Sequence, residues 1–482
     1  MGNKQKVKKI AVIGGGIAGL SAAYALEKEA ADNGISIEID LIEKEGRVGG
    51  NILTERVDDF IVEGGPDCVF SEKPASLNLC GKLDLEEELL KTMEEKKGTY
   101  IYWNNKLHDM PEGVILMIPT MIKPMLLSSL ITLPGKLRMA LEPLIPKRNN
   151  SDEETLSQFV TRRLGKELLD KIAEPLVAGI HAGNPETMSI NASFPRFVDL
   201  EQKYGSLIRG MLSRRKEMRS MMKGRTPKYT MFMTLKEGLQ NLTDSISKTL
   251  SNTSKTIDCK VVTIAKKAEE YELSFNNRNS NLYDSVVIAT PSYVSAALIK
   301  GIDSSLSNTL SEIPYVSTAT VSLAYSASDV DHIRKGFGFI VPRIAKRTIM
   351  AATYTSNKFS YRAPEGSMLL RCFVGGAQNE DLVFLHDKEM EKMVRNELKE
   401  IAGITATPIF TKIFRWEKAM PQYVIGHLDR VKKIQELSAK HPGLYLTGSA
   451  YNGIGISDCI TTSYKVAEEA VKFLNRPEAG PK

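Results

Sequence analysis

Three glycines near the start of the chain have the spacing of a nucleotide-binding turn. Residues 14–19 read Gly-Gly-Gly-Ile-Ala-Gly, directly after the apolar run 10–13 and before a segment with helical periodicity. In a G-x-G-x-x-G turn the first glycine permits a tight bend, the second lets a pyrophosphate approach the backbone, and the third lets the helix pack on the strand. Free N–H groups at the helix N-terminus then favour an anion. The contacts are expected from Gly14, Gly15, Gly16, Ile17, Ala18 and Gly19.

An acidic residue lies where such a site needs one. Glu43 ends a second run of alternating apolar residues, 35–42, roughly 20 residues beyond the last glycine. In a dinucleotide-binding βαβ unit this carboxylate accepts hydrogen bonds from the ribose hydroxyls. The alternative is a glycine-rich turn beside an ordinary surface glutamate. The order of strand, helix, second strand and acid favours the nucleotide site.

The next segment indicates which nucleotide is bound. Residues 43–51 read Glu-Lys-Glu-Gly-Arg-Val-Gly-Gly-Asn and resemble the E-x-x-x-R-x-G-G element of the amine-oxidase-like flavoproteins. There the arginine faces the pyrophosphate and the glycines bring the backbone near the flavin. A planar guanidinium suits phosphate oxygens. The resemblance implies FAD as the cofactor, held in this stretch by Glu43, Lys44, Arg47, Gly49, Gly50 and Asn51.

Three further segments resemble the same flavoproteins. Residues 63–68 read Glu-Gly-Gly-Pro-Asp-Cys and resemble the segment that passes the flavin ring, where glycine and proline suit a backbone pressed on a planar ligand. The strand around Val261 resembles the one whose backbone holds the adenine. Trp416, within Arg-Trp-Glu-Lys-Ala-Met-Pro-Gln-Tyr at 415–423, resembles a residue beside the flavin, although taken alone it could be a packed core aromatic. The resemblance implies contacts from Gly65, Pro66, Asp67, Cys68, Val261 and Trp416.

The second half of the site is expected near the C-terminus. Residues 452–459 read Asn-Gly-Ile-Gly-Ile-Ser-Asp-Cys and open the last helix, and they resemble the G-x-G-I-x-D-C flavin motif of the porphyrinogen oxidases. A helix N-terminus there would stabilise an anionic reduced flavin. Asp458 either caps the helix or binds the ribityl chain. The resemblance adds Gly455, Ile456, Ser457 and Asp458, so both ends of the chain must meet.

Other segments resemble the coproporphyrinogen III and protoporphyrinogen oxidases in particular, and specifically their Gram-positive type. They are residues 174–184, 205–210 and 420–427. The Gram-positive type usually has Tyr and Asp where this chain has His181 and Asn184, which puts the fine shape of the pocket in question. Lys73 aligns with a lysine proposed to meet a substrate propionate, and the alternative is a solvent-facing loop lysine. Ile180 aligns with a residue that lines the ring site, and His181 is adjacent to it.

The resemblance implies an FAD-dependent oxidase of haem biosynthesis. It would remove six hydrogens from coproporphyrinogen III in three two-electron steps, each with hydride transfer to flavin N5, and would pass the electrons to O2 with release of three H2O2. The four propionates of this substrate favour a more basic pocket than the two of protoporphyrinogen IX, which is the alternative substrate. No catalytic side chain is assigned, no metal-ligand spacing is present, and His181 and His427 are expected to be structural.

Composition agrees with an ordinary globular protein of more than one domain. The chain has 482 residues, 42% hydrophobic and 25% charged, with a formal net charge of +6. That charge is weaker than a nucleic-acid-binding surface requires. Five scattered cysteines suggest free thiols in a reducing cytoplasm. No apolar run approaches the roughly 20 residues of a membrane span, so stable membrane insertion is not expected. Transient contact with the next haem-pathway enzyme is the one protein partner expected.

The expected fold is α/β (α+β) in three parts. A discontinuous Rossmann-like FAD domain takes 1–72, 235–297 and 412–482, a β-sheet substrate-binding domain takes 73–105 and 298–411, and a helical insertion takes 106–228. Residues 235–250 are predicted to be helical. The basic stretch 203–228 is interpreted as a solvated loop, with a collar that attracts carboxylates as the alternative.

Two rival functions share the fold. An amine oxidase or carotenoid-type desaturase is opposed by the porphyrinogen-oxidase segments. A flavin-free chaperone of prenylated proteins is opposed by the intact glycine turn, Arg47 and the C-terminal motif. The colour of the purified protein separates the second rival, because a flavoprotein is yellow.

Overall fold

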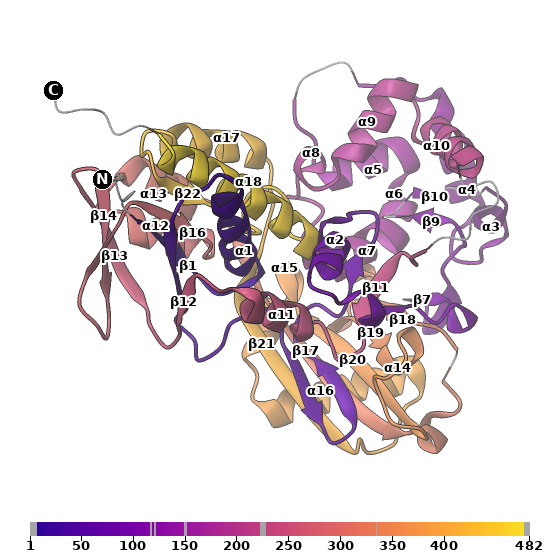
Figure 1. Ribbon diagram of the computed structural model, residues 1–482. Helices are drawn as coiled ribbons and strands as arrows, with labels where there is room; N and C mark the ends of the chain where they lie inside the picture. Colours follow the sequence, from indigo (N-terminus) through magenta and orange to yellow (C-terminus); the bar gives the residue numbers. More distant parts are fainter. Residues whose placement is uncertain are drawn as a thin grey trace, which may run out of the picture.

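The computed structural model describes residues 7–115, 118–119, 122–148, 152–221, 228–333 and 335–476, although a few side chains within these ranges are not described. The chain forms three regions that lie side by side: a layered α/β region containing both ends, a large sheet, and a helical region (Figure 1).

A five-stranded parallel sheet is the centre of the α/β region. Its order is β12-β2-β1-β16-β22. Strands buried on both faces read as continuous apolar runs, which is why β1 and β16 contain so few polar residues. The strands are β1 (Lys8–Ile13), β2 (Ile37–Ile42), β12 (Thr253–Thr256), β16 (Ser285–Ile288) and β22 (Leu444–Leu446).

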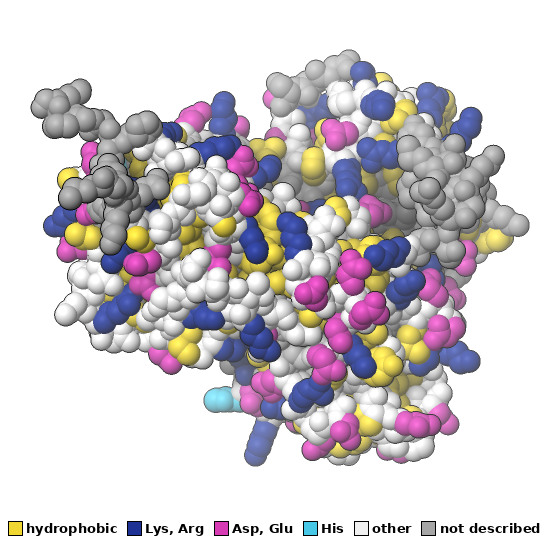
Figure 2. Space-filling view, in the orientation of Figure 1, with side chains coloured by type: hydrophobic (Ala, Val, Ile, Leu, Met, Phe, Trp, Pro, Cys, Tyr) yellow, Lys and Arg dark blue, Asp and Glu magenta, His cyan; other side chains and the backbone are white. Residues whose placement is uncertain are grey.

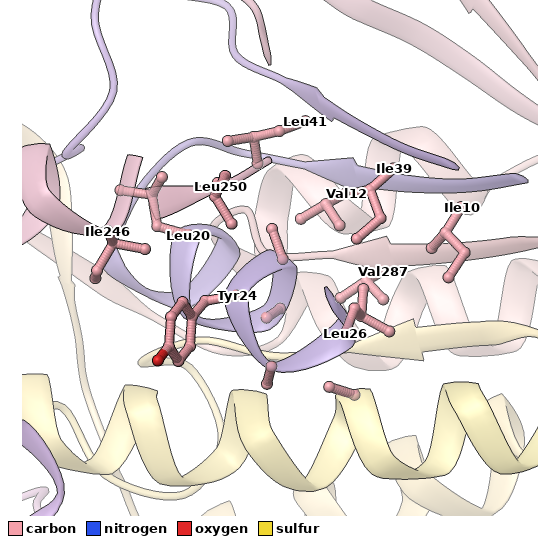
Figure 3. Packing of buried hydrophobic residues seen from close by; sticks show 14 of the residues in the cluster. Ile10, Val12, Leu20, Tyr24, Leu26, Ile39, Leu41, Ile246, Leu250 and Val287 are labelled. Atoms are coloured by element: carbon pink, nitrogen blue, oxygen red, sulfur yellow. The ribbon is translucent and has the colours of Figure 1, made fainter. Parts of the chain in front are cut away.

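Helices from distant parts of the chain cover both faces of this sheet. On one face α1 (Ile17–Asp32) packs between the sheet and α18 (Ile456–Leu474), with α11 (Gln240–Thr249) beside it (Figure 3). Leu20 and Leu26 of α1 are fully buried there. The other face packs against α12 (Ser292–Ile299), α13 (Ser304–Ser311), α17 (His427–Ser438) and the antiparallel sheet of β13 (Val261–Lys267), β14 (Glu270–Phe275) and β15 (Asn281–Tyr283).

A seven-stranded sheet forms the second region, in the order β21-β17-β20-β19-β18-β7-β8. All its neighbours are antiparallel except β18 and β7. Helix α16 (Asp387–Ala402) packs its apolar face on this sheet. The strands are β7 (Thr99–Trp103), β8 (Lys106–Asp109), β17 (Tyr315–Ser326), β18 (Gly338–Ile340), β19 (Ile349–Tyr354), β20 (Ser367–Gly375) and β21 (Phe410–Pro421).

The helical region has its own apolar core and a buried ion pair. Arg163 and Glu142 are fully buried and paired, and Glu142 also accepts a hydrogen bond from Leu207 N at 2.8 Å. The helices are α3 (Ile122–Leu127), α4 (Leu133–Ala140), α5 (Leu156–Leu164), α6 (Lys166–Leu168), α7 (Glu174–His181), α8 (Ile190–Ser193), α9 (Pro195–Tyr204) and α10 (Leu207–Met221), with a π-helical turn at Leu169–Ala173.

Small elements join the three regions. The sheets are β3 (Thr54–Val57) with β4 (Phe60–Glu63), β9 (Val114–Ile115) with β10 (Ile118–Pro119), and β5 (Val69–Phe70) and β6 (Leu89–Lys91) on either side of β11 (Phe232–Leu235). The helices are α2 (Ala75–Lys82), α14 (Thr355–Lys358) and α15 (Gly376–Asn379). Short 3-10 turns lie at Glu86–Glu88, Glu94–Lys96, Glu142–Leu144, Ala327–Val330, Arg343–Ala345 and Glu380–Phe384.

Two secondary-structure predictions are wrong. The helix expected over 235–250 begins only at Gln240, because Gly238 takes a positive φ of 95° that ends β11 in a turn. The basic stretch expected as a loop is α10 over residues 207–221, and its start is fixed by the buried Glu142 carboxylate. Lys and Arg side chains gather at the upper right of the molecule, where α9 and α10 lie (Figure 2). Residues 222–227 of the stretch lie outside the described residues.

Strand pairing moves two of the predicted domain boundaries. β8, at the predicted start of the helical insertion, pairs with β7, and β21, which spans the boundary at 412, pairs with β17 along most of its length. Continuous backbone hydrogen bonding therefore places 106–109 and 412–421 with the large sheet. The division into three domains stays a prediction. Within the described parts of the chain, every helix is too short or too polar to cross a bilayer.

Candidate FAD and substrate site

The glycine turn has the close backbone contacts that its spacing predicts. Gly14 has a φ of 103°, and a Cβ on Gly19 would lie 1.8 Å from the Gly14 carbonyl oxygen. A Cβ on Gly16 would meet only Gly50 Cα, at 3.9 Å, so the space before α1 is open. Gly16 caps α1 without a side-chain hydrogen bond. Because the first N–H groups of a helix have no intrahelical partner, this end can receive phosphate oxygens.

Glu43 lies beside this turn as predicted. Its buried carboxylate accepts hydrogen bonds from Gly15 N at 2.6 Å and Glu45 N at 2.9 Å. A carboxylate has about four acceptor positions, so two remain for ribose hydroxyls. The Glu43 carbonyl accepts from Cys259 N at 2.9 Å, which brings the start of β13 and the buried Val261 near the same end of β2. The neighbouring Lys44 is turned outward and pairs with Glu45.

Arg47 makes its hydrogen bonds within its own loop. Its guanidinium donates to the carbonyl oxygens of Val48 at 3.1 Å, Ile52 at 3.0 Å and Gly50 at 2.6 Å, and so holds its own loop in shape. Burial lowers its pKa below the ordinary value, while the charge of Glu43 opposes this change. Contact between Arg47 and a pyrophosphate stays a prediction.

The loop that Arg47 holds is pressed against the glycine turn. Gly49 N donates to the Gly15 carbonyl at 2.8 Å, and Gly16 and Gly49 form a parallel bridge. A Cβ on Gly50 would lie 3.0 Å from Gly16 Cα. The two glycine-rich segments therefore form one continuous backbone surface that larger residues would fill.

The segment after β4 is clamped from the large sheet. The Gly64 carbonyl accepts three hydrogen bonds: from Thr320 Oγ1 at 2.9 Å, Trp416 Nε1 at 2.9 Å and Arg371 Nη2 at 3.2 Å. A Cβ on Gly65 would lie 1.7 Å from the Asn51 carbonyl oxygen, so the segment lies directly on the end of the Arg47 loop. Trp416, which the resemblance places beside the flavin, thus positions this backbone.

Asp67, which follows Pro66, forms a buried charged pair with Lys358 at the end of α14. The sequence did not indicate this pair. Lys358 Nζ donates to Asp67 Oδ2 at 2.9 Å and lies 3.3 Å from Cys68 Sγ. Lys358 and Arg371 hold the pKa of Asp67 well below its usual range, in spite of burial. Burial, and then the Asp67 charge, raises the pKa of Cys68 to about 12, so this cysteine is a neutral thiol. The pair is an ammonium–carboxylate pair at neutral pH.

The C-terminal motif meets residues 73–76. Ser457 Oγ donates to the Lys73 carbonyl at 2.7 Å and lies 2.8 Å from Ser76 Oγ. Lys73 Nζ lies 2.6 Å from Asp458 Oδ2, and the same carboxylate accepts from Gly455 N at 3.3 Å. Asp458 therefore caps α18 and pairs with Lys73, and Ser457 fastens a neighbouring segment. Ile456 and Ile17 of α1 pack against the same apolar cluster, so the two ends of the chain do meet.

The predicted substrate residues lie at the end of α7. Ile180 is 45% exposed, and His181 contacts Phe194 edge-on. Burial lowers the pKa of His181 to about 4, and the charge of Lys73 acts in the same direction, so the ring is neutral at pH 7. The His181 carbonyl accepts from Gln422 Nε2 at 3.1 Å. This bond joins the 174–184 and 420–427 segments.

Tyr423 connects the 420–427 segment to the C-terminal motif. Tyr423 donates to the Ser449 carbonyl at 2.7 Å and accepts from Gly453 N at 2.8 Å. Its ring stacks on that of the fully buried His427 at 3.9 Å between centroids. The tyrosine was noted in the sequence only as part of a resemblance, and its role depends on the tertiary structure.

Most of the predicted site residues thus share one neighbourhood, and the backbone fits FAD. Glycines that would clash if substituted surround an uncapped helix N-terminus, and a carboxylate has free acceptor positions beside it. Lys358, Arg362 and Arg371 were missed. The sequence does contain a signal for Arg371, because an arginine within the apolar run 368–374 must be buried and partnered. No cluster that could hold a metal occurs among the described residues.

Known proteins resemble the chain over its whole length. Residues 17–471 match the family described as flavin containing amine oxidoreductase. Coproporphyrinogen III oxidase of Bacillus subtilis (strain 168) is 35% identical over 97% of this chain and 98% of its own, and that of Staphylococcus aureus is 31% identical over 97% and 100%. Protoporphyrinogen oxidase 1 of Spinacia oleracea is 31% identical over 96% of this chain and 84% of its own.

Solved structures agree with the fold. The crystal structure of a protein assigned as a protoporphyrinogen oxidase, from Exiguobacterium sp. 255-15, has a TM-score of 0.85 at 31% identity and covers 97% of this chain and 99% of its own. Reduced UDP-galactopyranose mutase has a TM-score of 0.70 at 15% identity, with 98% and 97% covered. The second likeness shows the fold alone.

Proposed function

Because the chain belongs to the coproporphyrinogen III and protoporphyrinogen oxidases within the flavin containing amine oxidoreductase family, we propose that it oxidises coproporphyrinogen III to coproporphyrin III. The reaction removes six electrons, passes them to O2 and releases three H2O2. The protein is an FAD-dependent oxidoreductase. The full-length similarity to two Gram-positive coproporphyrinogen III oxidases carries the choice of substrate.

Bound FAD supplies the hydride acceptor for each two-electron step. The chain's own residues would bind the cofactor and the substrate, orient them, and exclude water from the site. Gly16, Gly50 and the start of α1 would hold the pyrophosphate, and Glu43 the ribose. The segment 65–68 would lie along the ring, and the start of α18 would direct its partial positive charge toward it.

Substrate recognition would take place between α7 and residue 73. Ile180 offers an apolar contact for the macrocycle, and His181 stays neutral there. Lys73 pairs with Asp458, so a propionate bound at Lys73 would share its ammonium group with that carboxylate. We infer that the enzyme acts in the cytoplasm and hands its porphyrin to the next haem-pathway enzyme by transient contact.

Turnover of the two porphyrinogens tests the proposal. Coproporphyrinogen III and protoporphyrinogen IX are supplied separately to the yellow enzyme under air, and porphyrin fluorescence and peroxide are recorded together. We expect a higher kcat/KM for the tetra-carboxylate and three peroxides per porphyrin. A preference for protoporphyrinogen IX would establish the second candidate, which the similarity to the spinach enzyme supports. Amine oxidation without porphyrin formation would overturn both.

Lys73 allows a sharper test of the substrate. Lys73→Ala is expected to raise the KM for coproporphyrinogen III several-fold more than the KM for protoporphyrinogen IX. The reason is that coproporphyrinogen III carries four propionates that need cationic partners, and protoporphyrinogen IX carries two. Lys97→Ala is the control, since Lys97 is an exposed lysine paired with Glu94. Equal changes in the KM for the two substrates would exclude a propionate partner at Lys73.

A further inference from the structure

We propose that Lys358 is a positioning residue that compensates the charge of Asp67 and thereby sets the reduction potential of the bound flavin. The inference rests on the proposed function only in requiring that FAD binds. Nothing in the sequence motifs refers to Lys358, which lies at the end of α14 and is brought to the site by the large sheet.

The position of Asp67 follows from the segments on either side of it. Gly65 lies against Asn51, at the end of the Arg47 loop, and residues 73–76 contact Ser457 at the start of α18. The chain between them, which includes Asp67, therefore crosses from the N-terminal half of the flavin site to the C-terminal half. A charge on Asp67 lies where the bound ring would respond to it.

Lys358 is held tightly against this carboxylate. Its side chain is 13% exposed and that of Asp67 is 14% exposed. The ammonium group also lies 5.2 Å from the ring centroid of Phe232 and 5.1 Å from that of Phe359. Two aromatic faces and a carboxylate account for a charged lysine at this depth.

The pair belongs to a buried cluster with an excess of cations. Arg371 donates to the Gly64 and Gly65 carbonyls, and Arg362 lies 3.8 Å from Glu63. The cluster therefore contains Lys358, Arg362 and Arg371 against Asp67 and Glu63. Burial raises the pKa of Glu63, and the charge of Arg362 opposes this change. A positive environment stabilises an anionic reduced flavin over the neutral oxidised form.

This arrangement predicts opposite effects for the two members of the pair. Removal of the lysine charge leaves an uncompensated carboxylate near the ring and disfavours the reduced flavin. Removal of the Asp67 charge leaves the lysine charge uncompensated and favours the reduced flavin. A purely structural role cannot produce opposite signs, because lost packing would affect both variants alike.

The test is the two-electron reduction potential of the purified FAD-loaded enzyme, measured anaerobically at pH 8 against reference dyes. Lys358→Met is expected to shift the equilibrium between oxidised and reduced flavin at least tenfold toward the oxidised form. This shift makes the reduction potential about 30 mV more negative. Asp67→Asn is expected to shift it by a similar factor in the opposite direction. The double variant and Lys358→Arg should lie close to the native value.

Lys171→Met is the matched control. Lys171 is also a buried lysine, paired with Glu167 at 2.6 Å, but it lies in the helical region. Its loss should lower the melting temperature without moving the potential. If Lys358→Met fails to fold, the positive shift in Asp67→Asn still decides the question.

The two proposals fail in different ways. Shifts of the same sign in Lys358→Met and Asp67→Asn, or no shift in Asp67→Asn, would overturn this inference and leave the oxidase assignment intact. A native protein that binds no FAD would overturn the proposed function and this inference with it. A native enzyme that binds FAD but oxidises neither porphyrinogen would overturn the substrate assignment alone.

Discussion

At the scale of single residues, the site depends on positions where a side chain is forbidden. Gly19 and Gly65 face backbone carbonyl oxygens so closely that a Cβ would overlap them, at 1.8 and 1.7 Å. The end of a flexible side chain could move away from an added Cβ, but a backbone carbonyl held in place by the fold cannot. These glycines therefore determine how near the helix, the Arg47 loop and the 64–68 segment can approach one another.

Gly19→Ala is expected to reduce the affinity for FAD by at least tenfold, because α1 must move away from the turn that would hold the pyrophosphate. Fluorescence titration of the apoenzyme with FAD measures this. Gly301→Ala is the control, since no atom lies within 4 Å of a Cβ there and its φ is not positive. An unchanged affinity in Gly19→Ala would show that the turn does not hold the cofactor.

His427 makes a prediction about pH. Its folded pKa is lowered by burial to about 4 from 6.5, so the unfolded chain binds the proton more readily. The stability that comes from the neutral ring is therefore complete above pH 6.5 and is lost as the pH falls toward 4, by about 3 kcal/mol in all. Denaturant unfolding between pH 7.5 and 4.5 measures the loss.

His427→Gln removes the titration while keeping a donor for the Tyr451 carbonyl, which Nε2 contacts at 3.2 Å. The variant should show a flatter dependence of unfolding free energy on pH. If its slope equals that of the native protein, the acid sensitivity originates elsewhere.

At the scale of elements, the site is assembled by side chains that bond to the backbone of another segment. Trp416 of β21 holds the Gly64 carbonyl, Gln422 holds the His181 carbonyl, and Tyr423 holds the chain before α18. Each bond satisfies a polar backbone group where sheet or helix pairing ends. The RWEKAMPQY segment thereby connects the segment after β4, the end of α7 and the chain before α18.

Tyr423→Phe tests this connection. The change leaves the Gly453 N–H and the Ser449 carbonyl without their partner, which is expected to cost about 1–3 kcal/mol of unfolding free energy. Because both groups precede α18, FAD affinity should fall as well. Tyr102→Phe is a control, since Tyr102 is buried in the large sheet and its hydroxyl donates to Asn105 Oδ1 at 3.1 Å, outside this connection. A stability loss in Tyr423→Phe without any change in FAD affinity would separate the segment from the cofactor site.

At the scale of the whole molecule, the cofactor site is built from both ends of the chain. α1 packs between the central sheet and α18 (Figure 3). Ile17 and Ile456 pack against one apolar cluster. A ligand that contacts both segments stabilises the folded chain, since the unfolded chain does not hold these segments together.

FAD is therefore expected to stabilise the protein by about 2.7 kcal/mol when its free concentration is a hundred times the Kd. Thermal unfolding of the apoenzyme at increasing FAD concentration should show a melting temperature that rises steadily. FMN, which lacks the adenosine that Glu43 and Val261 would contact, should raise it much less. Equal stabilisation by FMN would leave the ribose role of Glu43 without support.

The first half of the nucleotide site could be predicted from the sequence, because the requirements there are local. A strand, a glycine turn and a helix follow one another within residues 8–32, and the acid follows at the end of the next strand, so spacing carried the prediction. The C-terminal motif and the substrate segments were indicated by their resemblance to known flavoproteins, and not by spacing. Their part in the site stays a prediction.

How those segments are held depends on the fold of the whole chain. Arg371 and Thr320 reach the site from the large sheet, and Lys358 reaches it from α14, which directly follows β19. Their pairing with residues 64–68 depends on strand order that no local pattern specifies. The predicted boundary at 412 divided a strand because the register of β21 is set by β17, almost 100 residues earlier. Lys73, Ser457 and Asp458 were identified as site residues, but their contacts with one another depend on segments over 380 residues apart. Burial and long-range pairing, which the sequence does not display, determine those contacts.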